Sequence, residues 1–314
     1  MSSAPSLRPV VAVIPVFNAP ADLADRLVEI AAQVERIVLV DDGTHSLSES
    51  PLASSDGIDL VELDHNGGIA RALNVGIRRA VAGGAASILT LDQDSALDPG
   101  YVDAALGTIE AARASGARVA FAVPAIVGGA PILRGRDANG EEIAFDPIQS
   151  GAVIPVDVIE TVGGFAESLF IDAVDSDFTL RARSAGYEVV IIEGTAMGHA
   201  LGDLVPITFF GRALVLGGRP RHVIYHSPFR TYYMVRNSIY LVQAHGRGNL
   251  AWHAKRWSKL GSMIVAAIIL APGRGQQVRA AQLGLRDGVQ KHFGKVKPAT
   301  LARIANRRRA SNRA

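Results

Sequence analysis

The sequence predicts an α/β fold in which a mostly parallel β-sheet is flanked by helices and followed by a helical C-terminal extension. Apolar runs rich in β-branched residues alternate with stretches of helical periodicity through the first hundred residues. Acidic residues directly follow two of these runs, as is typical of ligand sites at the carboxyl ends of parallel strands. With 314 residues, of which 48% are hydrophobic, the chain is also long enough to bury a large core.

The first hundred residues supply the alternating units. Their continuous apolar runs predict strands buried on both faces, and the intervening segments place apolar residues at helical spacing. The expected strands are Val10–Val16, Arg36–Val40, Ile58–Leu63 and Ser87–Leu91, and the expected helices are residues 21–33 and 68–82. Strands joined through a helix should run parallel to each other.

The rest of the chain is predicted to continue the sheet and then to become helical. Further strands are expected at residues 118–127, 151–155 and 187–192, and helices at 173–185, 228–244 and 250–270. Residues 198–227 are rich in Gly, Pro and His without a clear period, which predicts a long loop or flap. We therefore expect an α/β domain over residues 1–227 and a helical region over residues 228–314.

The composition excludes several classes of protein. The chain has no cysteine, which excludes disulfide scaffolds, thiolate metal sites and cysteine nucleophiles and fits a reducing, cytoplasmic setting. No apolar core follows a basic start at the N-terminus, and no run approaches the ~20 apolar residues that span a bilayer. We expect neither a secretory signal nor a membrane span.

The net charge of +2 hides an asymmetry along the chain. Residues 1–250 hold 18 Lys and Arg against 29 Asp and Glu, whereas residues 274–314 hold 11 basic residues and one acidic residue. Ahead of this basic tail, Trp252 and Trp257 precede an apolar stretch. Aromatic, basic and apolar residues in this order are typical of a helix lying in a membrane interface, so peripheral membrane contact through residues 251–314 is expected. Packing of this helix on the rest of the protein, or at a dimer contact, is the alternative.

Two pairs of acids follow predicted strands, Asp41 and Asp42 after the second and Asp92 and Asp94 after the fourth. Two carboxylates one residue apart at a strand end can hold one hard divalent cation such as Mg²⁺ or Mn²⁺. Because Asp is also favoured in turns and helix caps, a structural role is the alternative for each pair. The recurrence of paired acids at strand ends favours the metal site.

A third acidic cluster, Asp172, Asp175 and Asp177, stands at the start of the helix expected at residues 173–185. A carboxylate kept ionised by a helix N-terminus at the edge of a cleft is suited to act as a general base for a hydroxyl group. Asp177 is expected to pair instead with Arg181, one helical turn later.

His199 and Arg236 carry weaker signals. A histidine after a strand can bind a metal, although a hydrogen-bonding role is more common. An arginine can hold phosphate oxygens in a forked geometry, although a surface ion pair is the usual role.

Several ordered segments resemble family 2 glycosyltransferases of the GT-A fold, a Rossmann-like architecture. Two of them, residues 66–77 and 91–95, are similar to the rhamnosyltransferase branch. The resemblance covers roughly residues 10–245 and is carried by residues 13–18 (Val-Ile-Pro-Val-Phe-Asn), 40–44 (Val-Asp-Asp-Gly-Thr), 66–77, 91–95 (Leu-Asp-Gln-Asp-Ser), 163–165, 169–178, 199–202 and 232–237.

The resemblance implies roles for the matching positions. The expected contacts with the nucleotide-sugar donor are Pro15, Phe17, Asn18, Asp41 or Asp42, Asn66, Asp92, Gln93 and Arg236. Asp92 and Asp94 match the metal-binding acids, with His199 completing the site for Mg²⁺ or Mn²⁺. Asp175 falls where the family places its catalytic base, with Asp172 nearby for acceptor recognition. Val174 stands where the family often has Glu. This difference leaves Asp172 and Asp175 as alternatives for the catalytic base, and Asp175 is favoured.

The resemblance implies an inverting, metal-dependent sugar transferase, with dTDP-L-rhamnose as the favoured donor and a polysaccharide or lipid-linked glycan as the acceptor. UDP-galactofuranose or a UDP-hexose is the alternative donor, and a homo-oligomer is possible. A non-catalytic module that binds nucleic acid or membrane is the alternative of a different class. The acidic excess of residues 1–250 and the absence of a nucleic-acid-binding motif disfavour nucleic acid.

Overall fold

A computed structural model describes residues 6–136, 140, 142–198, 203–206, 208–209, 212–213, 215–216, 219–220, 222–270 and 273–305. Its contacts divide the chain into two compact units. The first unit comprises residues 1–170 and 174–200, and the second comprises residues 171–173 and 201–314. This division lies near residue 200, whereas the sequence suggested residue 227.

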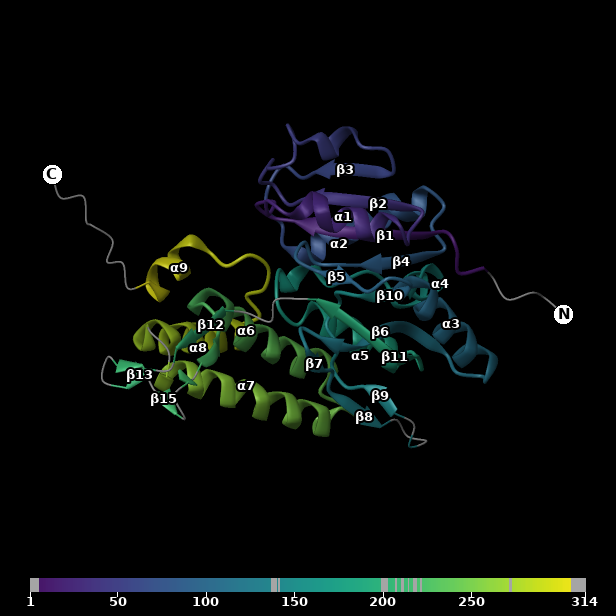
Figure 1. The fold of residues 1–314 in the computed structure, drawn as a ribbon. Coiled ribbons are helices and arrows are strands. Elements are labelled where there is room, and N and C mark those ends of the chain that lie inside the picture. The colour runs from purple at the N-terminus through teal and green to yellow at the C-terminus, as the bar shows by residue number, and fades with distance from the viewer. Residues whose placement is uncertain are drawn as a thin grey trace. The chain divides into compact units, whose positions relative to one another are not determined.

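The first unit is built on one large sheet, whose strand order Figure 1 shows from β3 to β11. The order is β3-β2-β1-β4-β10-β6-β11-β5, and β7 pairs with β6. The four strands of the N-terminal half run parallel, as predicted. They are β1 (Val10–Val16), β2 (Arg36–Asp41), β3 (Ile58–Glu62) and β4 (Ser87–Thr90).

The other half of this sheet is mixed. Strand β10 runs antiparallel to both of its neighbours, β4 and β6, whereas β6 and β11 run parallel. No helix lies in the described chain between β6 and β10, and antiparallel strands need no crossover helix. The α/β prediction is thus confirmed with one reversed central strand. These strands are β5 (Ala96–Leu97), β6 (Val119–Val127), β7 (Ala130–Pro131), β10 (Ala152–Pro155) and β11 (Glu188–Gly198).

Helices cover both faces of the sheet. Successive side chains of a strand point to opposite faces, and Val10, Ala12 and Ile14 of β1 share one core with buried residues of α1 and α3. Val13 faces the other way, toward Gly76 of α2. The helices of this unit are α1 (Leu23–Ala31), α2 (Ile69–Ala82), α3 (Tyr101–Ala114), α4 (Val156–Val162) and α5 (Val174–Ser184), with 3₁₀ turns at Pro51–Ser54 and Glu167–Leu169.

The segment predicted as a loop or flap, residues 198–227, contains short antiparallel strand pairs where it is described. The prediction was wrong for these parts, because strands of two to four residues are too short to show a period. The pairs are β12 (Asp203–Pro206) with β17 (His222–Tyr225), β13 (Thr208–Phe209) with β14 (Arg212–Ala213), and β15 (Val215–Leu216) with β16 (Arg219–Pro220). In the first unit, β8 (Arg134–Arg136) and β9 (Glu142–Ala144) form another such pair.

The second unit is otherwise helical. Its helices are α6 (Pro228–His245), α7 (Leu250–Leu270), α8 (Arg274–Val289) and α9 (Pro298–Ile304). Helix α8 packs closely on α6, and a methyl group at Gly284 or Gly288 would meet backbone atoms of α6. The described part of the basic tail is therefore folded into this unit.

Buried polar side chains join α6 to α8. The Thr231 hydroxyl donates to Gln277 Oε1 at 2.6 Å, and the Tyr232 hydroxyl donates to Asp287 Oδ2 at 2.7 Å. All four residues are less than a tenth exposed. Since a buried polar group is costly to leave unpaired, these contacts fix the register of the two helices.

Alanine at two helical glycines should change stability in opposite directions. A methyl group at Gly284 would meet the Tyr232 carbonyl, whereas one at Gly261 in α7 would meet nothing within 4 Å. We expect Gly284→Ala to lower the free energy of unfolding by about 1–3 kcal/mol, because α8 must move away from α6. Gly261→Ala should raise it by up to about 1 kcal/mol through helix propensity. Chemical denaturation measures both changes, and a stabilised Gly284→Ala protein would contradict the close packing.

Candidate functional site

The carboxyl ends of β1, β2 and β4 lie together in the first unit, because β1 pairs with both of the others in parallel register. Loops that follow parallel strands meet at this edge of a sheet, which is where ligands bind in open α/β folds. Three of the sequence segments that suggested a function, residues 13–18, 40–44 and 91–95, lie here, and a fourth, residues 66–77, follows the adjacent strand β3. Their hydrogen bonds to one another show how the site is assembled.

Asp41 ends β2 and is fully buried. Its carboxylate accepts hydrogen bonds from the backbone nitrogens of Thr44 (2.7 Å), His45 (3.0 Å) and Ser46 (2.8 Å), and from the Thr44 and Ser46 hydroxyls. Burial by itself would raise the pKa of Asp41, but the hydrogen bonds outweigh it and hold the pKa below its ordinary value. Asp41 is thus an ionised carboxylate that shapes the turn after β2.

Asp42 holds the next loop along the edge. Its Oδ1 accepts from the Gly67 nitrogen at 2.7 Å and its Oδ2 from the Gly68 nitrogen at 2.9 Å. The Asn66 side chain also accepts from the Gly68 nitrogen, at 3.1 Å. Gly68 has a φ of +90°, and a methyl group there would meet the Phe170 carbonyl, so both conformation and space require glycine. The Asn66 side chain thus helps to hold the loop backbone before α2.

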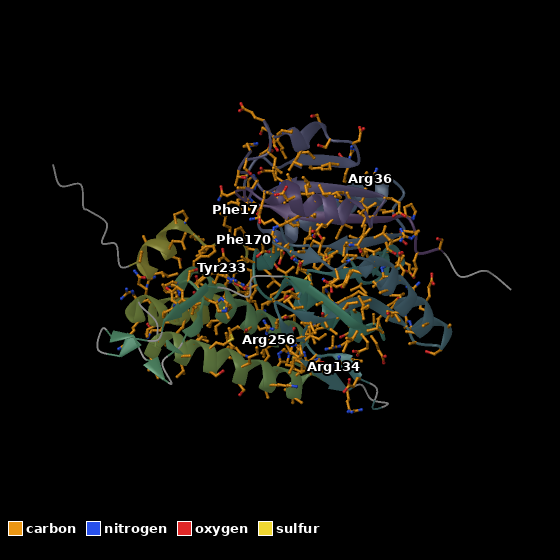
Figure 2. All side chains as sticks on the ribbon, in the orientation of Figure 1. Phe17, Arg36, Arg134, Phe170, Tyr233 and Arg256 are labelled. Carbon is orange, nitrogen blue, oxygen red and sulfur yellow. The ribbon has the colours of Figure 1, made fainter. Side chains whose placement is uncertain are left out.

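Phe17 and Asn18 follow β1 and are tied to the neighbouring loops. The Phe17 backbone nitrogen donates to Gln93 Oε1 at 2.8 Å, and Gln93 Nε2 donates back to the Phe17 carbonyl at 3.3 Å. The Asn18 nitrogen donates to the Thr44 hydroxyl at 3.3 Å. The Phe17 ring is 47% exposed and lies at the end of β1 in Figure 2, where it can contact a ligand. Pro15 lies within β1 and is held in the sheet.

Asp92 and Asp94 follow β4. Gln149 Nε2 donates to Asp92 Oδ1 at 2.5 Å, and the Asp92 nitrogen donates to the buried Ser150 hydroxyl at 2.9 Å. Arg26 Nη1 donates to the Asp94 carbonyl at 2.9 Å, which fixes the backbone of the loop. The sequence-predicted pair of acids therefore sits on a well-anchored turn at the ligand-binding edge.

The donor chemistry of this turn fits a hard divalent cation. Carboxylate oxygens suit Mg²⁺ and Mn²⁺, which are commonly bound by one or two carboxylates together with substrate phosphates. Among the described residues, no three His, Asp or Glu side chains are close enough to hold a metal by themselves. His199, the third predicted ligand, lies outside the described residues. A cation at Asp92 and Asp94 would thus need further ligands, such as diphosphate oxygens.

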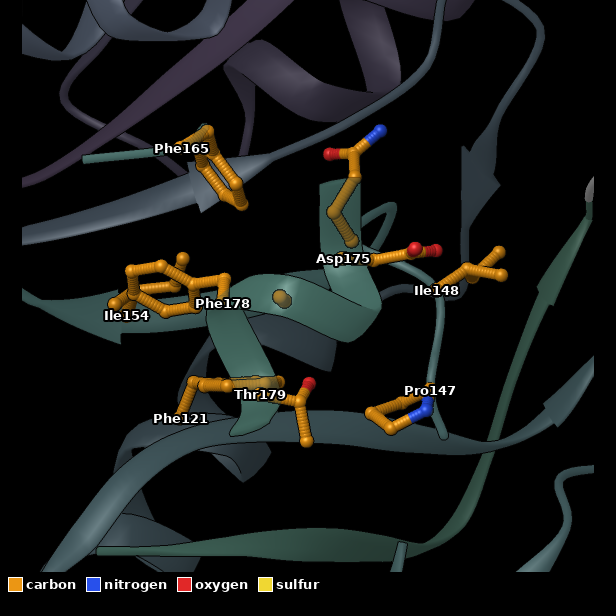
Figure 3. A pocket seen from close by; sticks show the side chains of 10 residues that line it. Phe121, Pro147, Ile148, Ile154, Phe165, Asp175, Phe178 and Thr179 are labelled. Carbon is orange, nitrogen blue, oxygen red and sulfur yellow. The ribbon is translucent and has the colours of Figure 1, made fainter. Parts of the chain in front are cut away.

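Asp175 stands in the first turn of α5 and lines a small cavity of the first unit, shown in Figure 3. The Ser176 nitrogen donates to Asp175 Oδ1 at 2.8 Å. The cavity wall is largely apolar and includes Phe178, whose ring contacts those of Phe121 and Phe165. Gln149 also lines this cavity, so a single side chain reaches both Asp92 and the surroundings of Asp175.

The predicted pairing of Asp177 is confirmed. Asp177 is buried, and its carboxylate accepts from Arg181 Nε at 2.8 Å, one turn later in α5. Arg181 also donates to the carbonyls of Val162 and Gly164. This pair therefore joins α5 to the loop after α4.

Asp172 lies in the second unit and is engaged in an ion pair. Arg230 Nη2 donates to Asp172 Oδ1 at 2.6 Å, and Asn237 Nδ2 donates to the carbonyls of Ile171 and Asp172 at 2.8 and 2.7 Å. Asp172 and Ala173 have φ values of +61° and +65°, a conformation that non-glycine residues adopt only when held there. Arg230 and Asn237 provide that hold.

Arg236 is fully buried within the second unit. Its Nη1 donates to the Gly294 carbonyl at 2.5 Å, its Nε donates to Asn237 Oδ1 at 2.9 Å, and its guanidinium carbon lies 4.5 Å from the centre of the Tyr233 ring. These contacts give Arg236 a structural role. Its expected contact with donor phosphates stays a prediction.

Two side chains that join the segments were not singled out from the sequence. Asn74 of α2 donates to the Phe165 carbonyl at 2.9 Å and accepts from the Phe165 nitrogen at 2.8 Å. Gln149 contacts Asp92, as described above. Asn74 stands among apolar residues on the buried face of its helix, a signal that sequence analysis can use. Gln149 lies in an irregular segment whose pattern offers no such signal.

A sequence profile described as "Glycosyl transferase family 2" matches residues 11–133. The curated protein "dTDP-rhamnosyl transferase RfbF" of Shigella flexneri is 31% identical over 245 residues, which cover 74% of this chain and 79% of that protein.

Solved structures of a Staphylococcus aureus protein, TarS 1–349, are similar in fold. Its complex with UDP has a TM-score of 0.58 at 14% identity, covering 91% of this chain and 82% of that chain. Its complex with UDP-GlcNAc has a TM-score of 0.51 at 13% identity, covering 91% of each chain. This likeness confirms the predicted GT-A fold, and at such low identity it shows the fold alone.

Asp41→Asn should destabilise the protein in a pH-dependent way. Near neutral pH we expect a loss of about 2 kcal/mol, because the donors of the turn lose a charged acceptor. The folded-state pKa of Asp41 lies below its unfolded-state value, so the wild-type advantage is full above the unfolded pKa of about 3.9. It declines as pH falls through the folded pKa. Urea denaturation of both proteins at several pH values measures the difference, and a difference independent of pH would contradict this role.

Proposed function

The chain belongs to glycosyl transferase family 2, and on this basis we propose that it transfers L-rhamnose from dTDP-L-rhamnose to a hydroxyl group of a polysaccharide or lipid-linked glycan. The observation that carries the proposal is the 31% identity to a dTDP-rhamnosyl transferase, which extends over 79% of that protein. The family membership also removes the non-catalytic alternative.

The donor lies at the carboxyl ends of β1, β2 and β4. Pro15, Phe17 and Asn18 line the nucleotide pocket, and the exposed Phe17 ring is placed to contact the nucleotide. Asp41 and Asp42 act in this pocket by shaping its loops, since protein donors already occupy their carboxylates. The rigid backbone of these loops is thus set before the donor arrives, which lowers the entropic cost of binding.

Asp92 and Asp94 would hold Mg²⁺ or Mn²⁺ at the diphosphate end of the donor. A bound divalent cation supplies charge stabilisation to the departing nucleotide diphosphate. The anchored turn keeps both carboxylates oriented without rearrangement during the reaction.

Asp175 acts as the general base. The acceptor oxygen forms a bond to the anomeric carbon of the sugar while the bond from that carbon to the diphosphate oxygen breaks, and Asp175 takes the proton of the acceptor hydroxyl. A single displacement of this kind inverts the configuration at the anomeric carbon. The ion pair of Asp172 with Arg230 supports Asp175 over Asp172 in this role.

Asp175→Asn should abolish transfer while leaving donor binding intact. Because the amide cannot accept the proton, we expect kcat to fall by roughly 10²–10⁴-fold. Binding of dTDP, measured as a rise in melting temperature, should match the wild type. Asp157→Asn, on the exposed side of α4, is the control and should retain activity. Full activity of Asp175→Asn would remove this residue from the mechanism.

The donor is tested with a panel of nucleotide sugars. At equal concentration, a ligand that binds the native state more tightly raises the melting temperature more. In the presence of Mn²⁺, we expect dTDP-L-rhamnose to give a larger rise than UDP-galactofuranose, UDP-glucose or UDP-GlcNAc at equal concentration. A larger rise with any UDP-sugar would assign that sugar instead.

We also propose that the second unit contacts anionic membrane lipid through the exposed side of α7. This side carries Lys255 and Lys259 together with the apolar residues Leu250, Val265 and Ile269. Trp252 is buried and does not serve as the expected aromatic anchor. No helix in the described ranges is apolar over a length that would cross a bilayer, so the contact is peripheral.

The lipid contact is tested by sedimentation with vesicles. Val265→Ser combined with Ile269→Ser should reduce binding to vesicles containing phosphatidylglycerol, because the apolar contribution is lost. Val28→Ser, at an exposed position of α1, is the matched control and should bind as the wild type does. Equal binding of all three proteins would contradict a role for α7.

A further inference from the structure

Gln149 occupies a fixed position between the two acidic clusters of the first unit. It lies in the segment between β9 and β10, and its side chain is 8% exposed. Its own carbonyl accepts from the Thr90 hydroxyl at 2.5 Å, which anchors the backbone to the end of β4. From this position Nε2 reaches Asp92 Oδ1 at 2.5 Å.

The contact with Asp92 determines which way the amide points. A carboxylate oxygen can only accept, so the NH₂ group must face Asp92 and the amide oxygen must face away from it. That oxygen, Gln149 Oε1, is buried and has no hydrogen-bond partner among the described residues. The same is true of the hydroxyl oxygen of Thr179, a fully buried residue of α5.

Gln149 also lines the cavity next to Asp175, and Figure 3 shows Thr179 and Asp175 on the same helix of its wall. The accessible lining of this cavity is apolar, so it offers the Gln149 side chain no polar partner. Among the described residues, the Gln149 amide therefore makes its side-chain hydrogen bond to the Asp92 carboxylate.

We propose that Gln149 is a positioning residue that holds the Asp92 carboxylate for the cation and the donor diphosphate. This inference rests on the proposed function, in which Asp92 contributes to cation binding.

Gln149→Met tests the contact with Asp92. Methionine preserves the length of the side chain and removes the N–H donor. Residues that hydrogen-bond to a metal ligand typically contribute about 10–100-fold to metal affinity. We therefore expect the Kd for Mn²⁺ to rise by about 10-fold or more in the presence of saturating dTDP. The Kd for dTDP without metal should stay within about twofold of the wild type, since the nucleotide loops are untouched. An unchanged Kd for Mn²⁺ would overturn the proposal.

Asp92→Asn separates this inference from the proposed function. If Asp92→Asn weakens Mn²⁺ binding and Gln149→Met does not, the positioning role of Gln149 alone fails. If neither variant changes the Kd for Mn²⁺, the cation site of the proposed function fails with it. Calorimetric titration of Mn²⁺ into the dTDP complex provides the readout independently of catalytic activity.

Discussion

The carboxylates at the end of β2 are the constraint on which the rest of the donor edge depends. Asp41 closes the turn after its own strand, and Asp42 accepts from two successive backbone nitrogens at the start of α2. The Thr44 hydroxyl in that turn accepts a hydrogen bond from the backbone nitrogen of Asn18, in the loop after β1. Because these bonds run to backbone groups, they hold loop shape independently of most side chains, and a pocket of fixed shape results.

The sequence predicted the parts of the fold whose signal is local. The apolar runs of β1 to β4 gave the parallel half of the sheet, and the four-residue spacing of Asp177 and Arg181 gave their ion pair. What it could not predict depends on contacts between distant residues. Strand β10 reads like any other apolar run, and its reversal is set by its neighbours. Trp252 and Arg236 resemble surface anchors in sequence but are buried, because α6, α7 and α8 pack on one another.

The candidate site, too, has features that the sequence predicts and features that depend on contacts between distant residues. The motif residues placed Asp42, Phe17 and Asp92 at one edge, since strand ends meet in any parallel sheet. Whether each acid faces a ligand or supports a loop depends on which donors reach it, and no spacing rule contains that information. Asp41 is occupied by protein donors, while Asp172 is paired with Arg230. Gln149 could be recognised as a neighbour of Asp92 only after the antiparallel course of β10 was known.

The close contact of α6 with α8 limits how the protein can be shortened. A chain that stops before Arg274 would keep α6 but lose Gln277 and Asp287, and with them the partners of the Thr231 and Tyr232 hydroxyls. It would also lose Gly294, whose carbonyl accepts from Arg236. A shortened form of the second unit should therefore keep the chain through α9, because the carbonyl of Ile304 also accepts from Arg279 of α8.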